Sequence, residues 1–181
     1  SLSSTRTTSL ASLKAKHWTE MTDSEMRQVY GDYTRDITTP YKGTAADLNK
    51  YLEGKGVLSG QGQAFIDAQN KYGISAAVLA GIAISESGGT SSLARKRFNV
   101  TSISSSRGWR RFNNVSECID YTASMLANRY VKNSGLSGVS LKTLYQINAK
   151  YCPVSDTRNN SSNNRFWAQN VENKVREIEK A

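Results

Sequence analysis

One segment of the chain, residues 76–84, reads AAVLAGIAI and would be apolar on every side of a helix. A surface helix carries a single apolar stripe, so this run predicts a helix that is buried in the core. Ser75 is placed to cap the start of this helix, and Gly88 and Gly89 are placed to end it and reverse the backbone. The helix leads into a single carboxylate, Glu86.

Glu86 follows Ile82 and Ala83 by three to four residues, so its side chain projects from a core-facing side of the helix. A buried carboxylate costs free energy unless it is protonated, paired or open to a cleft. In a cleft it would have the raised pKa of a general acid. On the pattern alone, a solvated or paired glutamate is the more common arrangement at a helix end, and both interpretations stay open.

Helical spacing of apolar residues predicts further helices along most of the chain. Thr44 with Asp47, and Asn114 with Glu117, have the spacing of a capping box at a helix start. The expected helices occupy residues 9–18, 23–33 (with Asp23 as N-cap), 44–53, 59–72, 114–130, 141–149 and 165–181.

Residues 98–106 interrupt the helical pattern, because FNVTSISSS is rich in β-branched residues and serine. Together with the GWRRF sequence at 108–112, this segment predicts a short strand or hairpin beside the helices. We therefore expect a mainly α (α+β) fold with a small β-hairpin lobe after the buried helix. The TTPYKG turn marks a connector, so we divide the chain into a helical lead-in segment, 1–43, and a main domain, 44–181.

A chain of 181 residues, 38% of them apolar, can bury the core of one domain. No segment approaches the roughly 20 apolar residues of a membrane span. The sequence begins at Ser1 rather than Met, so we take it as a mature form or a piece of a longer protein. We expect a monomer that reaches a membrane only through a segment outside this chain.

The formal net charge of +9 favours polyanionic partners such as nucleic acid, anionic lipid or an anionic cell wall. The sequence has no nucleic-acid-binding motif, so we expect no nucleic acid partner. The basic residues are scattered, apart from a cluster at 95–97 and a pair at 110–111. Ordinary solubilising charge explains them equally well.

The chain has two cysteines and one histidine, which are too few for the common zinc sites. The same small number argues against a Cys–His nucleophilic pair. We therefore expect no metal and no organic cofactor. A Cys118–Cys152 disulfide stays open as an alternative. Cys118 falls on the inner face of a predicted helix, which favours a buried free thiol.

Three elements follow one another from the end of the buried helix: ESGGTSSLA from Glu86, NVTSI from Asn99, and then Trp109. This ordered set resembles the bacterial and phage endo-β-N-acetylglucosaminidases, a lysozyme-like family of glycoside hydrolases that cut peptidoglycan. Residues 48–74 are also similar to the lead-in of staphylococcal autolysin-type members. The resemblance covers roughly residues 47–175 and implies a lysozyme-like helical fold.

The resemblance implies that residues 44–181 form the glucosaminidase catalytic domain, with Glu86 as its general acid. Hydrolysis also needs a group that stabilises the oxocarbenium-like centre or activates water. Glu117 lies where some relatives carry a second carboxylate, although it also fits a helix cap, and Asp120 is a weaker candidate. The alternative is assistance by the 2-acetamido group of the sugar, with Tyr151 orienting or stabilising the reacting centre.

The residues that we expect to bind substrate are Asn99, Ser102, Trp109, Phe112, Asp156 and Trp167. Ser102 stands where the family usually has glycine. The three aromatic residues are candidate sugar-stacking platforms, although isolated aromatic residues more often pack in a core. Asn99 either contacts an acetamido group or holds the β element against the buried helix. The aromatic residue that the family often has between the two glycines of the Glu motif is missing.

We therefore expect a peptidoglycan hydrolase that cuts the glycan strand on the reducing side of N-acetylglucosamine. Its partners would be glycan strands and anionic wall polymers, and it would act outside the cell, at the wall. A secreted autolysin, a membrane-tethered enzyme and a phage tail hydrolase all fit. Two alternatives stay open: a muramidase or lytic transglycosylase of the same fold, and a non-catalytic wall-binding or virion module.

Overall fold

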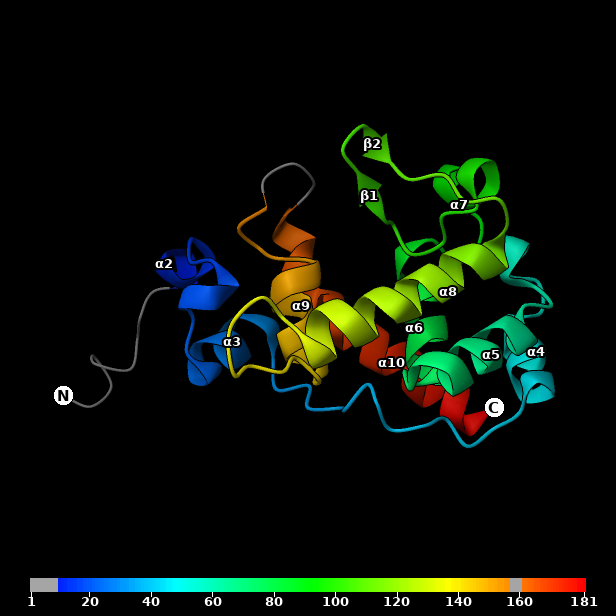
Figure 1. Cartoon of the computed structure of the whole chain (residues 1–181), viewed down its shortest axis with the longest axis horizontal. Helices are drawn as coiled ribbons and strands as arrows, with labels where there is room; N and C mark the ends of the chain where they lie inside the picture. The colour runs from blue at the N-terminus through cyan, green and yellow to red at the C-terminus, as the bar shows by residue number, and fades with distance from the viewer. Residues whose placement is uncertain (1–9, 157–160) are drawn as a thin grey trace.

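The computed structural model describes residues 10–156 and 161–181 of the chain. The described part is mainly helical, with one small antiparallel hairpin, which confirms the predicted fold class (Figure 1). The hairpin pairs β1 (Ser104–Ser105) with β2 (Gly108–Trp109). The α-helices are α2 (Leu10–Lys14), α3 (Asp23–Tyr30), α4 (Ala45–Leu52), α5 (Gly62–Tyr72), α6 (Ala76–Glu86), α7 (Ser92–Arg97), α8 (Val115–Leu126), α9 (Leu144–Tyr151) and α10 (Trp167–Lys180).

Four short turns of other helix types join these elements. Three are 3₁₀-helices, at Trp18–Glu20, Gly56–Leu58 and Ser161–Phe166. The fourth is a π-helical turn, Ala127–Lys132, which continues α8 without a break. The last helix therefore begins at Trp167, after a 3₁₀ turn, and not at residue 165 as predicted.

The helix α6 lies at the centre of the molecule, as its all-round apolar sequence predicts. Its residues from Ala76 to Ala83 are all buried. The helix α10 packs along it, and its buried residues follow the helical period (Figure 1). Gly81 makes this packing close, because a Cβ atom there would lie 3.1 Å from Val175 Cγ2 and 3.3 Å from the Val171 carbonyl oxygen. The two helices form the base of the functional site.

The remaining helices surround this pair (Figure 1). The amphipathic helix α8 crosses the molecule between the α4–α5 end and the α3–α9 end, and it buries its apolar face from Val115 to Leu126. At one end, α3 packs against α9 and α2 packs against α3. The hairpin and α7 project from the body on the side of the C-terminus of α6, where Glu86 lies.

The described part of the predicted lead-in, residues 10–43, is joined to the rest of the fold by backbone hydrogen bonds. The Ile37 amide donates to the Lys142 carbonyl at 2.9 Å, and the Ser75 amide donates to the Ile37 carbonyl at 2.7 Å. Arg35 forms an ion pair with the buried carboxylate of Glu172 at 2.8 Å. Leu13, Val29 and Ile37 belong to the same hydrophobic core as α6. Residues 1–9 lie outside the described part, and the division at residue 43 stays a prediction.

Several predicted helix starts and ends shift when tertiary contacts are present. The helix predicted over 23–33 is capped by Thr22, not Asp23, since the Thr22 side chain and Glu25 form a complete capping box. It ends at Tyr30 because Gly31 leaves the helical region with φ +86°. The helix predicted to start at residue 59 starts at Gly62, after a 3₁₀ turn. The caps at Thr44 and Ser75 are confirmed.

The sequence pattern missed α7 and misjudged the role of Glu117. The six-residue helix α7 is capped by the Ser91 side chain and ends at Phe98, which is left-handed with φ +53°. At the start of α8, Asn114 is the N-cap, as predicted. A full capping box would also need a hydrogen bond from the Asn114 backbone amide to the Glu117 carboxylate, and the described contacts of α8 do not include it. The Glu117 carboxylate instead accepts from the Asn113 side chain at 2.9 Å.

Both cysteines are free thiols. Cys118 is buried on the inner face of α8, as predicted, and its sulfur lies 3.3 Å from the Thr101 hydroxyl oxygen. Cys152 is partly buried at the end of α9. Burial raises the pKa of the Cys118 thiol, and it raises that of the Cys152 thiol to about 12, so both are protonated at neutral pH.

Candidate active site

Glu86 is the last residue of α6, and the turn after it is tightly fixed. The Ser87 hydroxyl lies 2.9 Å from the carbonyl oxygens of both Ala83 and Val100, which ties the end of α6 to the segment before the hairpin. The Gly89 carbonyl accepts from the Val57 amide at 2.9 Å. The end of α6 is therefore held from two sides, and the position of the Glu86 backbone is set by both.

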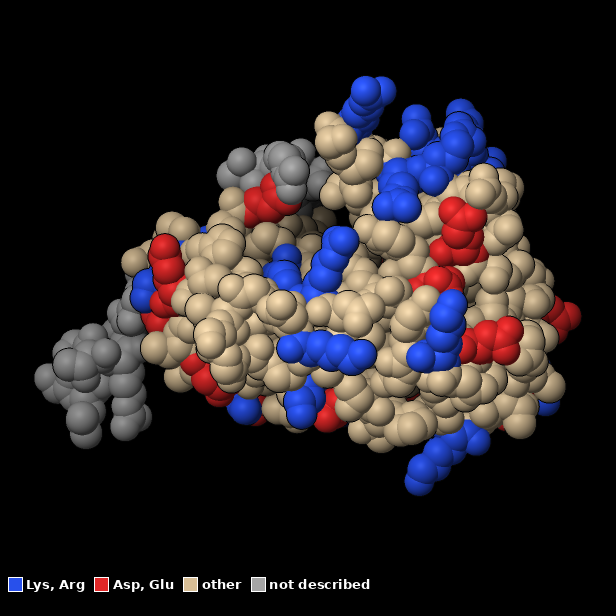
Figure 2. Space-filling view, viewed as in Figure 1, with Lys and Arg blue, Asp and Glu red and all other residues tan. Residues whose placement is uncertain are grey.

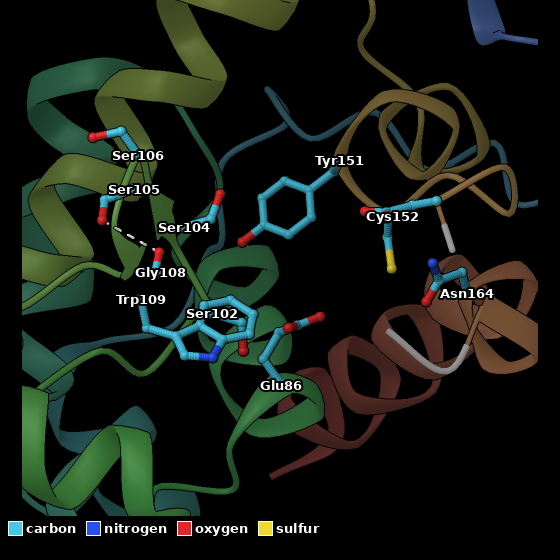
Figure 3. Close-up of a pocket in the computed structure, with 11 residues that line it drawn as sticks. Glu86, Ser102, Ser104, Ser105, Ser106, Gly108, Trp109, Tyr151, Cys152 and Asn164 are labelled. Carbon is cyan, nitrogen blue, oxygen red and sulfur yellow. Dashed lines mark hydrogen bonds between the residues drawn. The ribbon is translucent and has the colours of Figure 1, made fainter. Parts of the chain in front are cut away.

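A cavity of about 400 Å³ opens in front of Glu86 (Figure 3). One wall is the hairpin with the segment before it, and the other is the end of α9 with the loop that follows. Figure 3 shows the Glu86 carboxylate reaching into the space between these walls. The lining residues are Glu86, Ser102, Ser104, Ser105, Ser106, Gly108, Trp109, Tyr151, Cys152, Asp156 and Asn164.

The Glu86 carboxyl group accepts a hydrogen bond from the Trp167 indole N–H, which lies 2.9 Å from its Oε1 atom. Burial raises the pKa of Glu86, and the nearby Ser102 hydroxyl and the Trp167 indole oppose this shift by favouring the ionised form. Because burial dominates, the pKa of Glu86 lies above its usual value, as the position at the helix exit predicts.

Tyr151 lies in the same cavity, at the C-terminal end of α9. Its hydroxyl donates to the Thr101 carbonyl at 2.6 Å, and its ring packs 5.1 Å from the Trp167 ring, centroid to centroid. Burial, together with the nearby Glu86 charge, raises the pKa of Tyr151 well above its usual value. The phenol is therefore protonated at neutral pH, and it donates to the Thr101 carbonyl. Figure 3 shows its ring in the space between the hairpin and α9.

Five of the residues that the sequence singled out gather here besides Glu86. Ser102, Trp109, Tyr151 and Asp156 line the cavity, and Trp167 bonds to Glu86 from behind it. Trp109 is 40% exposed on β2, so its ring is free to receive a ligand. Asp156 supplies a second carboxylate to the lining.

Other candidates lie away from the cavity. Asn99 is fully buried, and its side chain bonds to Ile103 and Arg110 backbone groups at 2.8–2.9 Å, so it holds the hairpin lobe together. Phe112 is buried against Tyr121. Glu117 is exposed at the start of α8. These three are not among the residues that line the cavity.

Asp120, the weaker candidate for a second carboxylate, is also engaged elsewhere. It accepts from the Tyr72 hydroxyl at 2.9 Å and pairs with Lys71 at 3.4 Å, on the side of α8 that faces α5. The sequence analysis missed Cys152 and Asn164 as lining residues, and it gave no role to the Ser104–Ser105 strand. A serine-rich hairpin has no distinctive chemistry by itself, and only the fold places it opposite Glu86.

Ser102 has a strained backbone, with φ +60°, a region that glycine occupies at no cost. The family that the sequence resembles usually has glycine at this position. In this chain the serine has a hydroxyl that favours the ionised form of Glu86, which glycine cannot supply. The Ser102 side chain therefore lowers the pKa of Glu86, whereas burial raises it.

We expect S102G and S102A both to raise the pKa of Glu86, because each removes a hydroxyl that favours the carboxylate. The pKa is measured by an NMR titration of ¹³C-labelled glutamate side chains. The two variants should differ in stability, since S102A keeps the left-handed strain of about 1 kcal/mol that S102G relieves. An unchanged or lowered pKa in both variants would contradict this role of the hydroxyl.

The described residues contain no group of three or more His, Cys, Asp or Glu side chains that could hold a metal ion. Within the same residues, none of the helices combines the length and apolar character needed to span a bilayer.

The comparisons with known proteins agree with this geometry. The model of the glucosaminidase family, described as mannosyl-glycoprotein endo-beta-N-acetylglucosaminidase, matches residues 62–180, more than half of the chain. The chain belongs to the glucosaminidase family. The resemblance to this family is thereby confirmed.

Individual relatives come from staphylococci. The chain is 37% identical over 100 residues to the bifunctional autolysin of Staphylococcus epidermidis, which is 54% of this chain but 8% of the autolysin. The chain thus spans less than a tenth of the length of this curated relative. Two crystal structures of S. aureus autolysin E superpose with TM-scores of 0.67 and 0.65 at 22% identity, over 89% of this chain and 79% of that one. At this identity the likeness shows a shared fold.

Proposed function

We propose that this chain hydrolyses the glycan strands of peptidoglycan on the reducing side of N-acetylglucosamine, with Glu86 as general acid. The observation that carries the proposal is the Glu86 carboxyl group, which has a raised pKa and faces a cavity of about 400 Å³ at the end of a buried helix. The family supports a glucosaminidase. The two autolysin E structures are complexes with a NAG-NAM disaccharide and with a muropeptide, which supports a wall-derived substrate.

Glu86 would deliver its proton to the glycosidic oxygen as the bond to C1 breaks. The raised pKa increases the protonated fraction of the side chain at a given pH, and the Trp167 bond helps to hold it in one orientation. After proton transfer the Trp167 indole and the nearby Ser102 hydroxyl would stabilise the carboxylate. Water later returns a proton to Glu86 as it adds to C1.

For the second group we propose the 2-acetamido oxygen of the sugar, which would attack C1 as the leaving group departs. Tyr151, a protonated phenol in the cavity, is placed to orient this group. Asp156 is the alternative, as the other carboxylate that lines the cavity. The Glu117 carboxylate accepts a hydrogen bond from Asn113, and the Asp120 carboxylate accepts one from Tyr72. These bonds outside the cavity argue against a direct role for either carboxylate.

The serine-rich hairpin and Trp109 would bind the sugar chain. Trp109 offers an exposed ring at the cavity wall, and Ser104, Ser105 and Ser106 offer hydroxyl groups beside it. A pyranose ring needs both an apolar face to stack on and donors for its hydroxyls. We place the protein at the cell wall, outside the cytoplasm, as a secreted, membrane-tethered or phage-borne hydrolase.

We expect digestion of purified peptidoglycan by this protein to create N-acetylglucosamine at the new reducing ends. Borohydride reduction followed by mass spectrometry identifies the sugar at each new end. New ends that carry muramic acid or anhydromuramic acid would show that the protein cuts the other glycan bond, as a muramidase or lytic transglycosylase does. Binding to walls with no new ends would support a non-catalytic module instead.

A further inference from the structure

A band of six basic residues lies beside the cavity, and we call it the basic ridge. The helix α7 carries three of them, and the hairpin and the segment after it carry the other three. All six are exposed. Figure 2 shows blue side chains gathered over α7 and the hairpin, more densely than elsewhere on this face. The members of the ridge are Arg95, Lys96, Arg97, Arg107, Arg110 and Arg111.

The charge of the basic ridge is not neutralised within the chain. No Asp or Glu occurs in the sequence between Glu86 and Glu117, which is the segment that carries all six bases. Each salt bridge of the described residues uses a base outside the ridge. Residues 95–97 lie in the last turn of α7, where the helix dipole favours cations. The dipole does not explain the three arginines of the hairpin segment.

Three of the arginines are held in place by bonds that leave their charge unpaired. Arg97 Nη1 donates to the Trp109 carbonyl, and Arg111 Nη1 donates to the Lys96 carbonyl, each at 2.9 Å. The Arg110 guanidinium lies 4.2 Å from the centroid of the Tyr121 ring. These bonds connect α7 to the hairpin segment and order the side chains, so a ligand would lose less conformational entropy on binding them.

The basic ridge adjoins the cavity that holds Glu86. Trp109 and Gly108 line that cavity, and the ridge residues Arg107 and Arg110 flank them in the sequence. The carbonyl of Trp109 is itself the acceptor for Arg97. A polymer bound along the ridge would therefore run next to whatever occupies the cavity.

We propose that the basic ridge binds a phosphodiester polymer that accompanies the glycan strand in the wall. Five of its six bases are arginines, whose planar fork matches phosphate oxygens. A chain with one charge at every repeat can contact several of the bases at once, whereas an isolated carboxylate can contact one or two. The wall as the source of the polymer rests on the proposed function; the phosphate chemistry rests on the ridge alone.

The test uses fluorescently labelled poly(glycerol phosphate) and the triple variant R95Q/K96Q/R107Q. Among the described contacts, these three side chains have no hydrogen bond or ring contact, so their removal leaves the ridge backbone intact. The matched control is K42Q/K142Q/K180Q, which removes three exposed lysines elsewhere. Fluorescence anisotropy at several salt concentrations gives the affinity and its salt dependence.

We expect the ridge variant to bind poly(glycerol phosphate) about tenfold or more weakly at low salt, with a log–log salt slope reduced by about two. The control variant should stay within about twofold of the parent. Equal losses in both variants would overturn the proposal. So would equally tight binding of the parent to polyglutamate, or tighter binding to single-stranded DNA of the same charge.

Cleavage assays separate this proposal from the proposed function. On walls stripped of phosphate polymers the ridge variant should keep the rate of the parent, and on untreated walls it should be slower. A parent that fails to cut stripped walls would refute the hydrolase and leave the anisotropy result standing. A ridge variant that cuts both kinds of wall as fast as the parent would refute a role for the ridge in wall digestion.

Discussion

E86Q should digest peptidoglycan at least about 1000-fold more slowly than the parent, because the amide has no proton to give to the leaving oxygen. Glutamine keeps the size of the side chain, and its amide oxygen can still accept from the Trp167 indole N–H. The loss should therefore fall on the chemical step and spare the binding of glycan. The rate is measured as release of soluble fragments from a wall suspension, and glycan binding is measured in parallel.

E117Q is the matched control for E86Q, since it changes a carboxylate that lies outside the cavity. It should digest walls within about threefold of the parent. If E86Q digests walls at the parent rate, Glu86 is not the acid. If E117Q loses as much activity as E86Q, a second carboxylate acts from the start of α8 and substrate assistance by the acetamido group is the wrong mechanism.

E86Q also separates a loss of catalytic activity from a loss of folding stability. Burial raises the pKa of Glu86 in the folded state, so this group stabilises the fold at low pH and loses that contribution as the pH rises through the folded pKa. E86Q does not titrate and is spared this loss. Thermal unfolding should therefore show E86Q at least as stable as the parent at pH 7, while it is inactive.

G89A should lower the free energy of unfolding by about 3 kcal/mol, the largest effect on stability that we expect from a single methyl group. Gly89 has φ +76°, and a Cβ atom there would lie 2.0 Å from the Lys55 carbonyl oxygen and 3.1 Å from Leu58 Cγ. The clash is with backbone, which cannot rotate away. The Val57–Gly89 hydrogen bond across this contact would also be broken.

G88A is the natural control, because the neighbouring glycine has a similar φ of +61° but open space around it. Its nearest contact would be 3.8 Å, to the Thr90 hydroxyl, so we expect a loss of about 1 kcal/mol from backbone strain alone. Urea unfolding of both variants measures the difference. Equal losses would show that the approach of residues 55–58 to Gly89 contributes nothing beyond the left-handed backbone.

The sequence predicts the centre of the fold well because the signal there is local. An apolar run with a serine cap and a double glycine predicts a buried helix, and the helix in the structure ends at Glu86. The β-hairpin is predictable in outline from its serine and β-branched residues. The helix α7 was missed since it has six residues, a single buried side chain at Ala94, and too few turns to show a period.

The partners of Glu86 depend on the packing of distant elements. Trp167 is 81 residues away in the chain and reaches the carboxyl group only because α10 packs against α6. Nothing in the local sequence distinguishes it from Phe112, which is also a lone aromatic but is buried elsewhere. Without the resemblance, Tyr151 and Trp167 would have been read as core residues, and both are in fact part of the core as well as of the site.

For Asn99 the sequence leaves two roles open, contact with a ligand or support of the β element, and the contacts in the structure agree with the second. A polar residue inside a motif suggests contact with a ligand, yet its amide group is fully used by three backbone groups of the hairpin lobe. Its role in shaping the cavity is indirect, since it fixes the segment that carries Ser102. Sequence pattern alone cannot tell a residue that touches a ligand from one that shapes the loop around it.

The indole bond to Glu86 has an optical consequence. Indole fluorescence responds to charge at the hydrogen-bond acceptor of its N–H group, and Trp167 donates that N–H directly to Glu86 at 2.9 Å. The other two tryptophans, Trp18 and Trp109, form no hydrogen bond to Glu86 among the described contacts. We therefore expect the emission of Trp167 to change as Glu86 gains or loses its proton.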